Sequence, residues 1–395
     1  MLEFANRIRR FDAPPNPAVA VKAAEMTAGG DDVISLLDSF PDLEPAYETR
    51  EAAINAVRDG NVRPTDPAGI PELREAVSRY FTETVGLSVP ASQIVATPGA
   101  SFAIYAALQA LVNDGDEVVL FTPGRPSDTA HVKLAGGIPR VIPLQEDDGF
   151  HLETDNFDRL VPARVRGFVL SSPADPTGVV WAEEELSAIG EIAVHRNLFV
   201  VCDETNAAFR FGGKPVSLAA ISPKYAAQTV TVADLGTALA LPGWNIGCAA
   251  GPEELIRKIA EIQTFSASHP NPVAQLACLS GIKSGGSSRE KANSEYRERR
   301  DSLVSSLQGL HGFRCQPPDG GLSVFANIQY YLGKEVGGEV PTTSTDFARI
   351  LLEKARVAVL PGSRFGAEGY VRLSFTRPLE KLQEAVKRIR PVLEK

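Results

Sequence analysis

The chain has 395 residues, of which 44% are apolar and 23% are charged, which is enough for one large domain and a smaller one around a sizeable core. Its net charge of −9 argues against nonspecific binding of nucleic acid, and no stretch reaches the roughly 20 consecutive apolar residues of a membrane-spanning helix. The N-terminus lacks a signal-peptide pattern, and the four cysteines are scattered without metal-ligand spacing. We therefore expect a cytoplasmic protein without a metal site.

Short apolar runs alternate with helical patterns through the first two thirds of the chain. The sequence predicts strands at residues 117–121, 141–144, 167–171, 198–203 and 229–233, and helices at 103–112, 127–135 and 183–195. Runs this short, rich in Val, Ile and Phe, suit strands that are covered on both faces. The alternation predicts a mainly parallel sheet flanked by helices.

The pattern changes beyond about residue 285. A long charged helix is predicted at residues 288–307, followed by a strand at 322–326, a helix at 344–354, a strand at 370–375 and a final helix. This succession predicts a smaller α+β domain. We expect a sheet domain over residues 46–285, and a small domain formed by residues 1–45 and 286–395.

Three segments carry candidate chemistry. In Thr97-Pro98-Gly99-Ala100-Ser101, a glycine precedes an apolar helix whose free N–H groups could bind an anion, although a plain turn with Ser101 as N-cap is an alternative. Asp203 ends the most apolar strand, where a carboxylate is costly to bury without a partner. Arg372 lies in an alternating strand, where an inward arginine would need a carboxylate, and an outward, solvated arginine is the alternative.

Seven segments together resemble the fold type I pyridoxal phosphate (PLP) enzymes, specifically the class I and II aminotransferases. In order they are VISLLDSFPDLEP, DPAGIPELREAV, TPGASFAIYAAL, SSPADPTGVVW, VVCDET, LALPGWNIG and PGSRFGAEGYVRLSF, and they cover nearly the whole chain. The resemblance implies an aspartate-aminotransferase-like α/β fold, with a mainly parallel seven-stranded sheet and a smaller α+β domain. It also implies a homodimer in which two chains build each site.

The resemblance assigns roles to residues that match the family's motifs. Asp203 matches the aspartate that holds the ring nitrogen of PLP, and Arg372 matches the arginine that binds the substrate carboxylate. Gly99, Ala100 and Ser101 match the phosphate-binding loop.

Other positions depart from the family pattern. The Schiff-base lysine falls on Thr237, which has no amine, and the arginine after Gly-Trp falls on Asn245. The remaining departures are the ring-hydroxyl asparagine at Asp175, the tyrosine after Asp-Glu at Asn206, the stacking aromatic at Arg125 and the intersubunit tyrosine near Pro64. Together they predict that the cofactor's role has been replaced.

We therefore expect no cofactor, or PLP bound only noncovalently, and an enzyme that is not a conventional transaminase. It would act on a carboxylate-bearing, amino-acid-like substrate by PLP-independent acid–base chemistry, namely elimination, cyclisation, isomerisation or condensation. The candidate catalytic residues are Asp175, Asp203, Arg125 and Thr237, and the candidate substrate-binding residues are Arg372, Asn206, Asn245 and Ser101.

Three alternatives remain open. Arg125 could neutralise Asp175 or Asp203 in a purely structural ion pair. The chain could be a noncatalytic or regulatory subunit that pairs with a lysine-bearing paralogue. It could also be an enzyme that binds PLP or its amine form, pyridoxamine phosphate (PMP), noncovalently.

Overall fold

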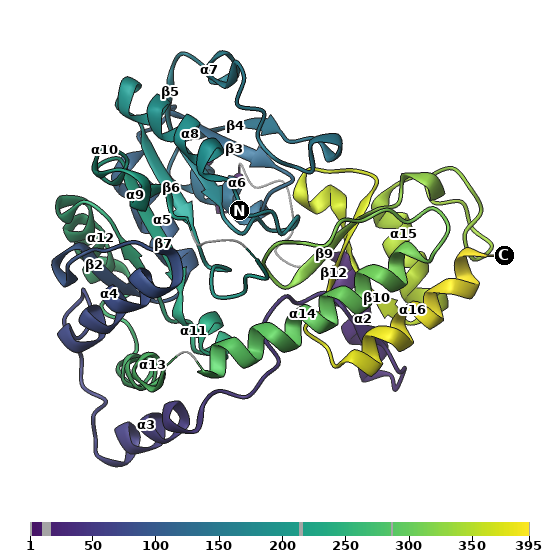
Figure 1. Cartoon of the computed structure of the whole chain (residues 1–395), viewed down its shortest axis with the longest axis horizontal. Coiled ribbons are helices and arrows are strands. Elements are labelled where there is room, and N and C mark those ends of the chain that lie inside the picture. Colours follow the sequence, from purple (N-terminus) through teal and green to yellow (C-terminus); the bar gives the residue numbers. More distant parts are fainter. Residues whose placement is uncertain (1, 10–16, 213–215, 286, 395) are drawn as a thin grey trace.

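The computed structural model describes residues 2–9, 17–212, 216–285 and 287–394. Figure 1 shows a part built on one large sheet and a smaller part around the C-terminal helices. We call them the sheet region and the tail region. The predicted domain boundaries at residues 45 and 285 stay a prediction. Among the described residues, no helix is both long and apolar enough to span a membrane.

A seven-stranded sheet forms the centre of the sheet region. Its strands are β2 (Ile94–Thr97), β3 (Glu117–Thr122), β4 (Ile138–Pro143), β5 (Val165–Ser171), β6 (Phe199–Asp203), β7 (Thr229–Asp234) and β8 (Gly247–Ala250). The spatial order is β2-β8-β7-β6-β5-β3-β4, in which β8 runs antiparallel to both neighbours and the other pairs are parallel. The sheet is thus mainly parallel, as the sequence predicts.

Helices cover both faces of this sheet. The helices of the sheet region are α1 (Asn6–Arg9), α3 (Tyr47–Arg58), α4 (Pro71–Val85), α5 (Ala100–Leu111), α6 (Pro126–Leu134), α7 (Phe157–Leu160), α8 (Glu183–Arg196), α9 (Leu218–Ile221), α10 (Pro223–Ala226), α11 (Leu235–Ala238), α12 (Glu253–Ser266) and α13 (Pro272–Ser284). Alternate residues of one strand enter different cores: Val200 packs with Ile189 of α8, and Val201 packs with Ile104 of α5. Strands buried on both faces read as continuous apolar runs.

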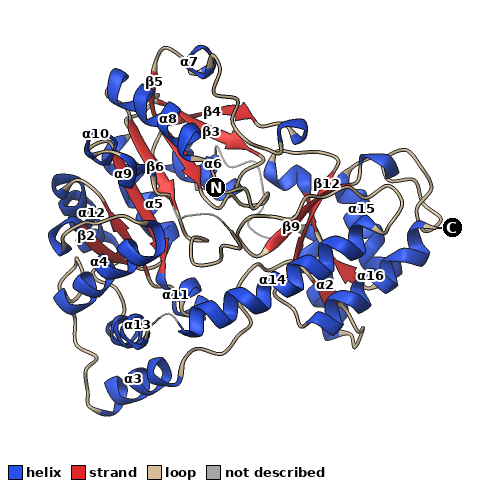
Figure 2. Cartoon of the chain, in the orientation of Figure 1, coloured by secondary structure: helices blue, strands red, loops and turns tan. Residues whose placement is uncertain are grey.

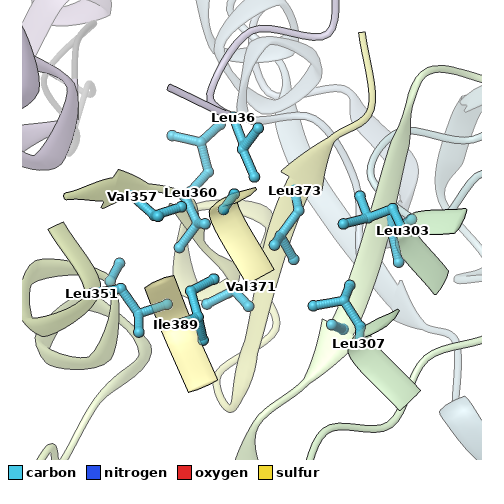
Figure 3. Close-up of a cluster of buried hydrophobic side chains, with 14 of the residues drawn as sticks. Leu36, Leu303, Leu307, Leu351, Val357, Leu360, Val371, Leu373 and Ile389 are labelled. Carbon is cyan, nitrogen blue, oxygen red and sulfur yellow. The ribbon is translucent and has the colours of Figure 1, made fainter. Parts of the chain in front are cut away.

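The tail region combines the chain's N-terminal segment with its last hundred residues. It holds α2 (Ala18–Ala28), β1 (Ile34–Ser35), α14 (Ser287–Gln308), β9 (Ser323–Asn327), α15 (Ser344–Ile350), a π-helical turn (Leu351–Ala355), β10 (Val357–Ala358), β11 (Leu360–Pro361), β12 (Tyr370–Ser374) and α16 (Leu379–Leu393). β12 is the central strand of the antiparallel sheet β11-β12-β9, and β1 pairs with β10. Figure 3 shows Leu36, Leu303, Val371 and Ile389 meeting in one core.

The carboxyl ends of the parallel strands position the candidate site. Because β3, β5, β6 and β7 are parallel, their last residues lie along one edge of the sheet, where ligands gather in open α/β sheets. Figure 2 shows the strands of the two regions as separate groups joined by loops and α14. The loop after β5 meets β12 of the tail region at this edge, through Asp175 and Arg372.

Candidate functional site

Arg125 and Asp203 form the buried centre of the site. Asp203, the last residue of β6, is 1% exposed, and one of its oxygens pairs with the Arg125 guanidinium. Its other oxygen accepts the N–H of Thr205 at 2.9 Å. Arg125 immediately precedes α6 and also donates to Oδ1 of Asp128 at 2.8 Å. One arginine therefore serves two carboxylates.

The charges in this cluster depend on one another. Burial opposes the charge on Arg125, but the carboxylates of Asp128 and Asp203 outweigh it and raise its pKa further above the ordinary value. Burial raises the pKa of Asp128, and the nearby Arg125 opposes that rise only in part. Arg125 thus stays a cation, because removing its charge would leave buried carboxylates without a counter-ion.

A second ion pair links the two regions. Nη1 of Arg372, in the middle of β12, lies 3.0 and 3.1 Å from the two carboxylate oxygens of Asp175, in the loop after β5. Nη2 donates to the carbonyl of Leu37, and Nε has no hydrogen-bond partner. The inward position of Arg372 agrees with the interpretation that it needs a carboxylate, which here belongs to the chain itself.

The N-terminus of α5 is also occupied by a side chain. Asp234, the last residue of β7, accepts the N–H of Thr237 at 2.7 Å and the N–H of Ala100. Burial raises the pKa of Asp234, and these hydrogen bonds oppose the rise. Gly99 has a φ of 81°, and an added Cβ there would lie 2.2 Å from Oδ1 of Asn245, so this turn requires glycine.

Ser101 and His131 are joined beside this helix end. Oγ of Ser101 lies 3.1 Å from Nε2 of His131 on α6, and Nδ1 of His131 has no partner. Burial and the charge of Arg125 lower the pKa of His131 to about 4. The imidazole is therefore neutral at pH 7.

The candidate residues fall into two groups instead of one pocket. Arg125, Asp203, Asp175 and Arg372 surround the buried ion pairs, and Asp175 also acts electrostatically on Arg125. Gly99, Ala100, Ser101, Thr237 and Asn245 gather at the start of α5. Among the described contacts, no hydrogen bond links the Asn206 side chain to either group. This side chain faces Gly321, where an added Cβ would lie 3.8 Å from Nδ2 of Asn206.

Asp234 and Asp128 belong to the site but are not among the residues predicted from the sequence. Asp234 follows an apolar strand and precedes a tight turn, which is the same pattern that singled out Asp203, so the signal was present. Asp128 lies three residues after Arg125 on α6 and pairs with it. Its role as a partner of Arg125 can be inferred only once the side chain of Arg125 is known to point inward.

Comparisons with known proteins agree across the whole chain. A family model described as aminotransferase class I and II matches residues 31–389. The aspartate aminotransferase of Geobacillus stearothermophilus is 32% identical over 395 residues, covering 100% of this chain and 99% of that protein. The aspartate/prephenate aminotransferase of Thermus thermophilus is 33% identical over 396 residues, covering 100% and 99%.

Solved structures give the same result. The crystal structure of the aspartate aminotransferase from Rhizobium meliloti matches with a TM-score of 0.94 at 29% identity and 99% coverage of both chains. The aspartate aminotransferase from Thermus thermophilus with maleate matches with a TM-score of 0.92 at 32% identity and full coverage of both chains. The expected aspartate-aminotransferase-like fold is confirmed.

Two functional expectations are wrong in the light of these comparisons. We expected PLP-independent acid–base chemistry by an enzyme that is not a conventional transaminase, and we expected no cofactor. Full-length relatives at 32–33% identity are named aspartate or aspartate/prephenate aminotransferases, which points to transamination, and the family resemblance implies PLP for that reaction. The departures at single positions do not outweigh a match that spans the chain.

The residues match PLP in kind but do not fit it as they are placed. A helix N-terminus suits a phosphate, and a buried aspartate suits a protonated ring nitrogen. However, the Asp234 carboxylate already holds the N–H of Ala100, and Arg125 already pairs with Asp203. Among the described residues, the cavity of about 200 Å³ beside Arg125 is lined by no lysine. Accommodating PLP would require both side chains to move.

Proposed function

The chain belongs to the class I and II aminotransferase family, and we propose that it binds amino acids and 2-oxo acids by their carboxylate for the transfer of an amino group. The names of its relatives support this reaction class. The Thermus thermophilus enzyme whose structure contains maleate, a dicarboxylate, supports the ligand class. Arg372 is the residue to which we assign the carboxylate.

The observation that carries the proposal is the position of Arg372. Its side chain is 9% exposed and points from β12 toward the edge of the large sheet, where Asp175 meets it. A guanidinium has two parallel N–H donors that suit a carboxylate, and burial strengthens such a pair. A substrate carboxylate would take the place that Asp175 now holds.

Calorimetry with maleate tests this assignment. We expect Arg372→Ala to weaken maleate binding by about 10- to 100-fold, because a hydrogen-bonded charge pair contributes about 1.5–3 kcal/mol. Arg372→Lys should recover only part of the affinity, because it loses the paired donors. The matched control is Arg388→Ala, which removes an arginine on α16 that pairs with Asp32. This variant should bind maleate like the wild type. Equal binding by Arg372→Ala would overturn the assignment.

We also propose that Thr237 takes the place of the family's Schiff-base lysine. The proposal is supported by its spacing from Pro242-Gly243-Trp244 and by its buried position on α11, directly after β7. A hydroxyl cannot form the covalent link, and it is a weak base for moving a proton. Loss of a positioned base typically costs a factor of about 10²–10⁴ in rate, so we expect slow transfer by the wild type.

Finally, we propose that the chain is a homodimer, as the resemblance implies. Support comes from α3, which projects at the edge of the molecule beside α13 (Figure 1). Its outward side chains include Tyr47 and Val57, which are 65% and 61% exposed. Exposed apolar faces of this kind are typical of protein contact surfaces. The cytoplasmic location stays a prediction.

A further inference from the structure

Three binding groups of the site already hold partners from the same chain. The family resemblance assigns the start of α5 to a phosphate, Asp203 to a ring nitrogen and Arg372 to a substrate carboxylate. In the structure, these groups hold Asp234, Arg125 and Asp175 respectively. In every case the internal partner carries the same sign of charge as the ligand it would replace.

The match is closest at the start of α5. A phosphate would bind the N–H groups of the first helical turn through its anionic oxygens. The Asp234 carboxylate supplies anionic oxygen to Ala100 of α5, and it also accepts the N–H of Thr237 at 2.7 Å. Oδ1 of Asn245 packs closely against Gly99. A phosphate entering here would lose a hydrogen bond donor and meet a second negative charge, which repels it at short range.

At Asp203, too, a side chain of the protein supplies the charge that the cofactor would supply. A protonated pyridine ring would give this carboxylate a cationic N–H, and Arg125 gives it a cationic N–H from a guanidinium. Arg125 is held from behind by Asp128 at 2.8 Å and is mostly buried. A ring nitrogen can reach Asp203 only if this guanidinium withdraws.

We propose that Asp234 and Arg125 are internal ligands that exclude a phosphorylated pyridine from the resting site, and that Asp175 does the same for a carboxylate at Arg372. The part that concerns Arg372 rests on the proposed function, whereas the parts that concern Asp234 and Arg125 do not. The site is therefore satisfied without a ligand, and any cofactor or substrate must compete with groups of the protein. Residues 234 and 125 then determine cofactor affinity without forming a bond to it.

Binding of PMP, which cannot form a Schiff base with a lysine, tests the proposal directly. Its fluorescence gives a dissociation constant for the wild type, Asp234→Ser, Arg125→Leu and the double variant. We expect each single variant to bind PMP about 10- to 100-fold more tightly than the wild type, which is the range of one charged contact. The double variant should gain more than either single variant. Inorganic phosphate should compete with PMP in variants with Asp234→Ser and only weakly in the wild type.

Two matched controls isolate the site. Asp116→Ser removes a carboxylate that accepts a backbone N–H beyond the other end of α5, and Arg140→Leu removes an exposed ion pair with Glu117; neither should change PMP affinity. Circular dichroism verifies folding, and Asp234→Asn replaces Asp234→Ser if the serine variant does not fold. The proposal is overturned if the wild type binds PMP as tightly as the variants, or if no variant gains affinity. Maleate binding at Arg372 is measured in a separate experiment. The PMP result therefore tests Asp234 and Arg125 even if Arg372 does not bind maleate.

Discussion

Thr237 is buried three residues after the end of β7, and its backbone N–H donates to the carboxylate of Asp234. The segment from Thr229 to Arg257 contains no lysine, so no amine of this segment can bond to an aldehyde. The carboxylate of Asp234 lies directly beside this position. We therefore expect that replacing this one residue would not be enough to form a covalent link to PLP.

We expect Thr237→Lys alone to give little amino-group transfer between aspartate and a 2-oxo acid. Combining it with Asp234→Ser and Arg125→Leu should raise the rate at least about 10-fold, because the positioned base then acts on a cofactor that can enter. Borohydride reduction, digestion and mass spectrometry should locate a pyridoxyl group at position 237 only in the lysine variants. A wild-type chain already modified on another lysine would contradict the assignment of Thr237.

At the scale of elements, Glu185 fixes the start of α8 against the loop before α7. Its carboxylate accepts the N–H groups of Ala182 and Leu152 and lies 3.0 Å from Nδ1 of His151. Burial raises the pKa of Glu185, but its hydrogen bonds outweigh that effect and lower the pKa below the ordinary value. The hydrogen bond to Glu185 raises the pKa of His151. The native fold thus favours both charges.

These shifts give stability a pH dependence. Protonated His151 stabilises the native state fully below its ordinary pKa of 6.5 and loses that contribution as pH rises through the higher folded-state pKa. We expect urea unfolding to show that the wild type loses about 0.5 kcal/mol relative to His151→Asn from about pH 6 to about pH 9, a small value because the pair is partly exposed and screened. A constant difference across this range would contradict the ion pair.

Glu185 adds the opposite limit. Its lowered pKa stabilises the native state above the ordinary value of 4.5 and loses the contribution as pH falls through the lower folded-state value. The pair therefore contributes most between these two limits. Glu153→Gln is the control for Glu185→Gln. The described contacts of the Glu153 carboxylate include no hydrogen bonds like those of Glu185.

At the scale of the whole molecule, the outward face of α3 predicts association. We expect light scattering after gel filtration to give twice the mass of one chain, and Ile54→Asp with Val57→Asp to give a monomer, because charges cannot be buried unpaired in an apolar contact. Val340→Asp changes an equally exposed apolar residue of the tail region and should leave the dimer intact. A monomeric wild type at micromolar concentration would contradict the homodimer.

The sequence predicts most of the architecture but less of the site. β5, β6 and β7 are recognisable because each is mostly buried and contains several β-branched or aromatic residues. β2 and β8 are only four residues long, and β8 consists of Gly, Cys and Ala, so neither has a strong strand signal. β8 lies between β7 and β2 in the sheet. Without β8, the sequence does not predict that β7 ends, at Asp234, beside the start of α5.

The site shows the same limit at single residues. The ion pair of Arg125 with Asp203 is the arrangement that the structural alternative expects. The sequence could not decide between Asp203 and Asp175 as its partner, because that choice depends on β12 delivering Arg372 to Asp175. Side-chain pairing across two regions is set by tertiary packing, which local sequence patterns do not encode.

The ion pair between Arg372 and Asp175 joins a strand of the tail region to a loop of the sheet region. A carboxylate that bound Arg372 in place of Asp175 would therefore remove this link between the two regions. When that carboxylate left, Arg372 and Asp175 could pair again.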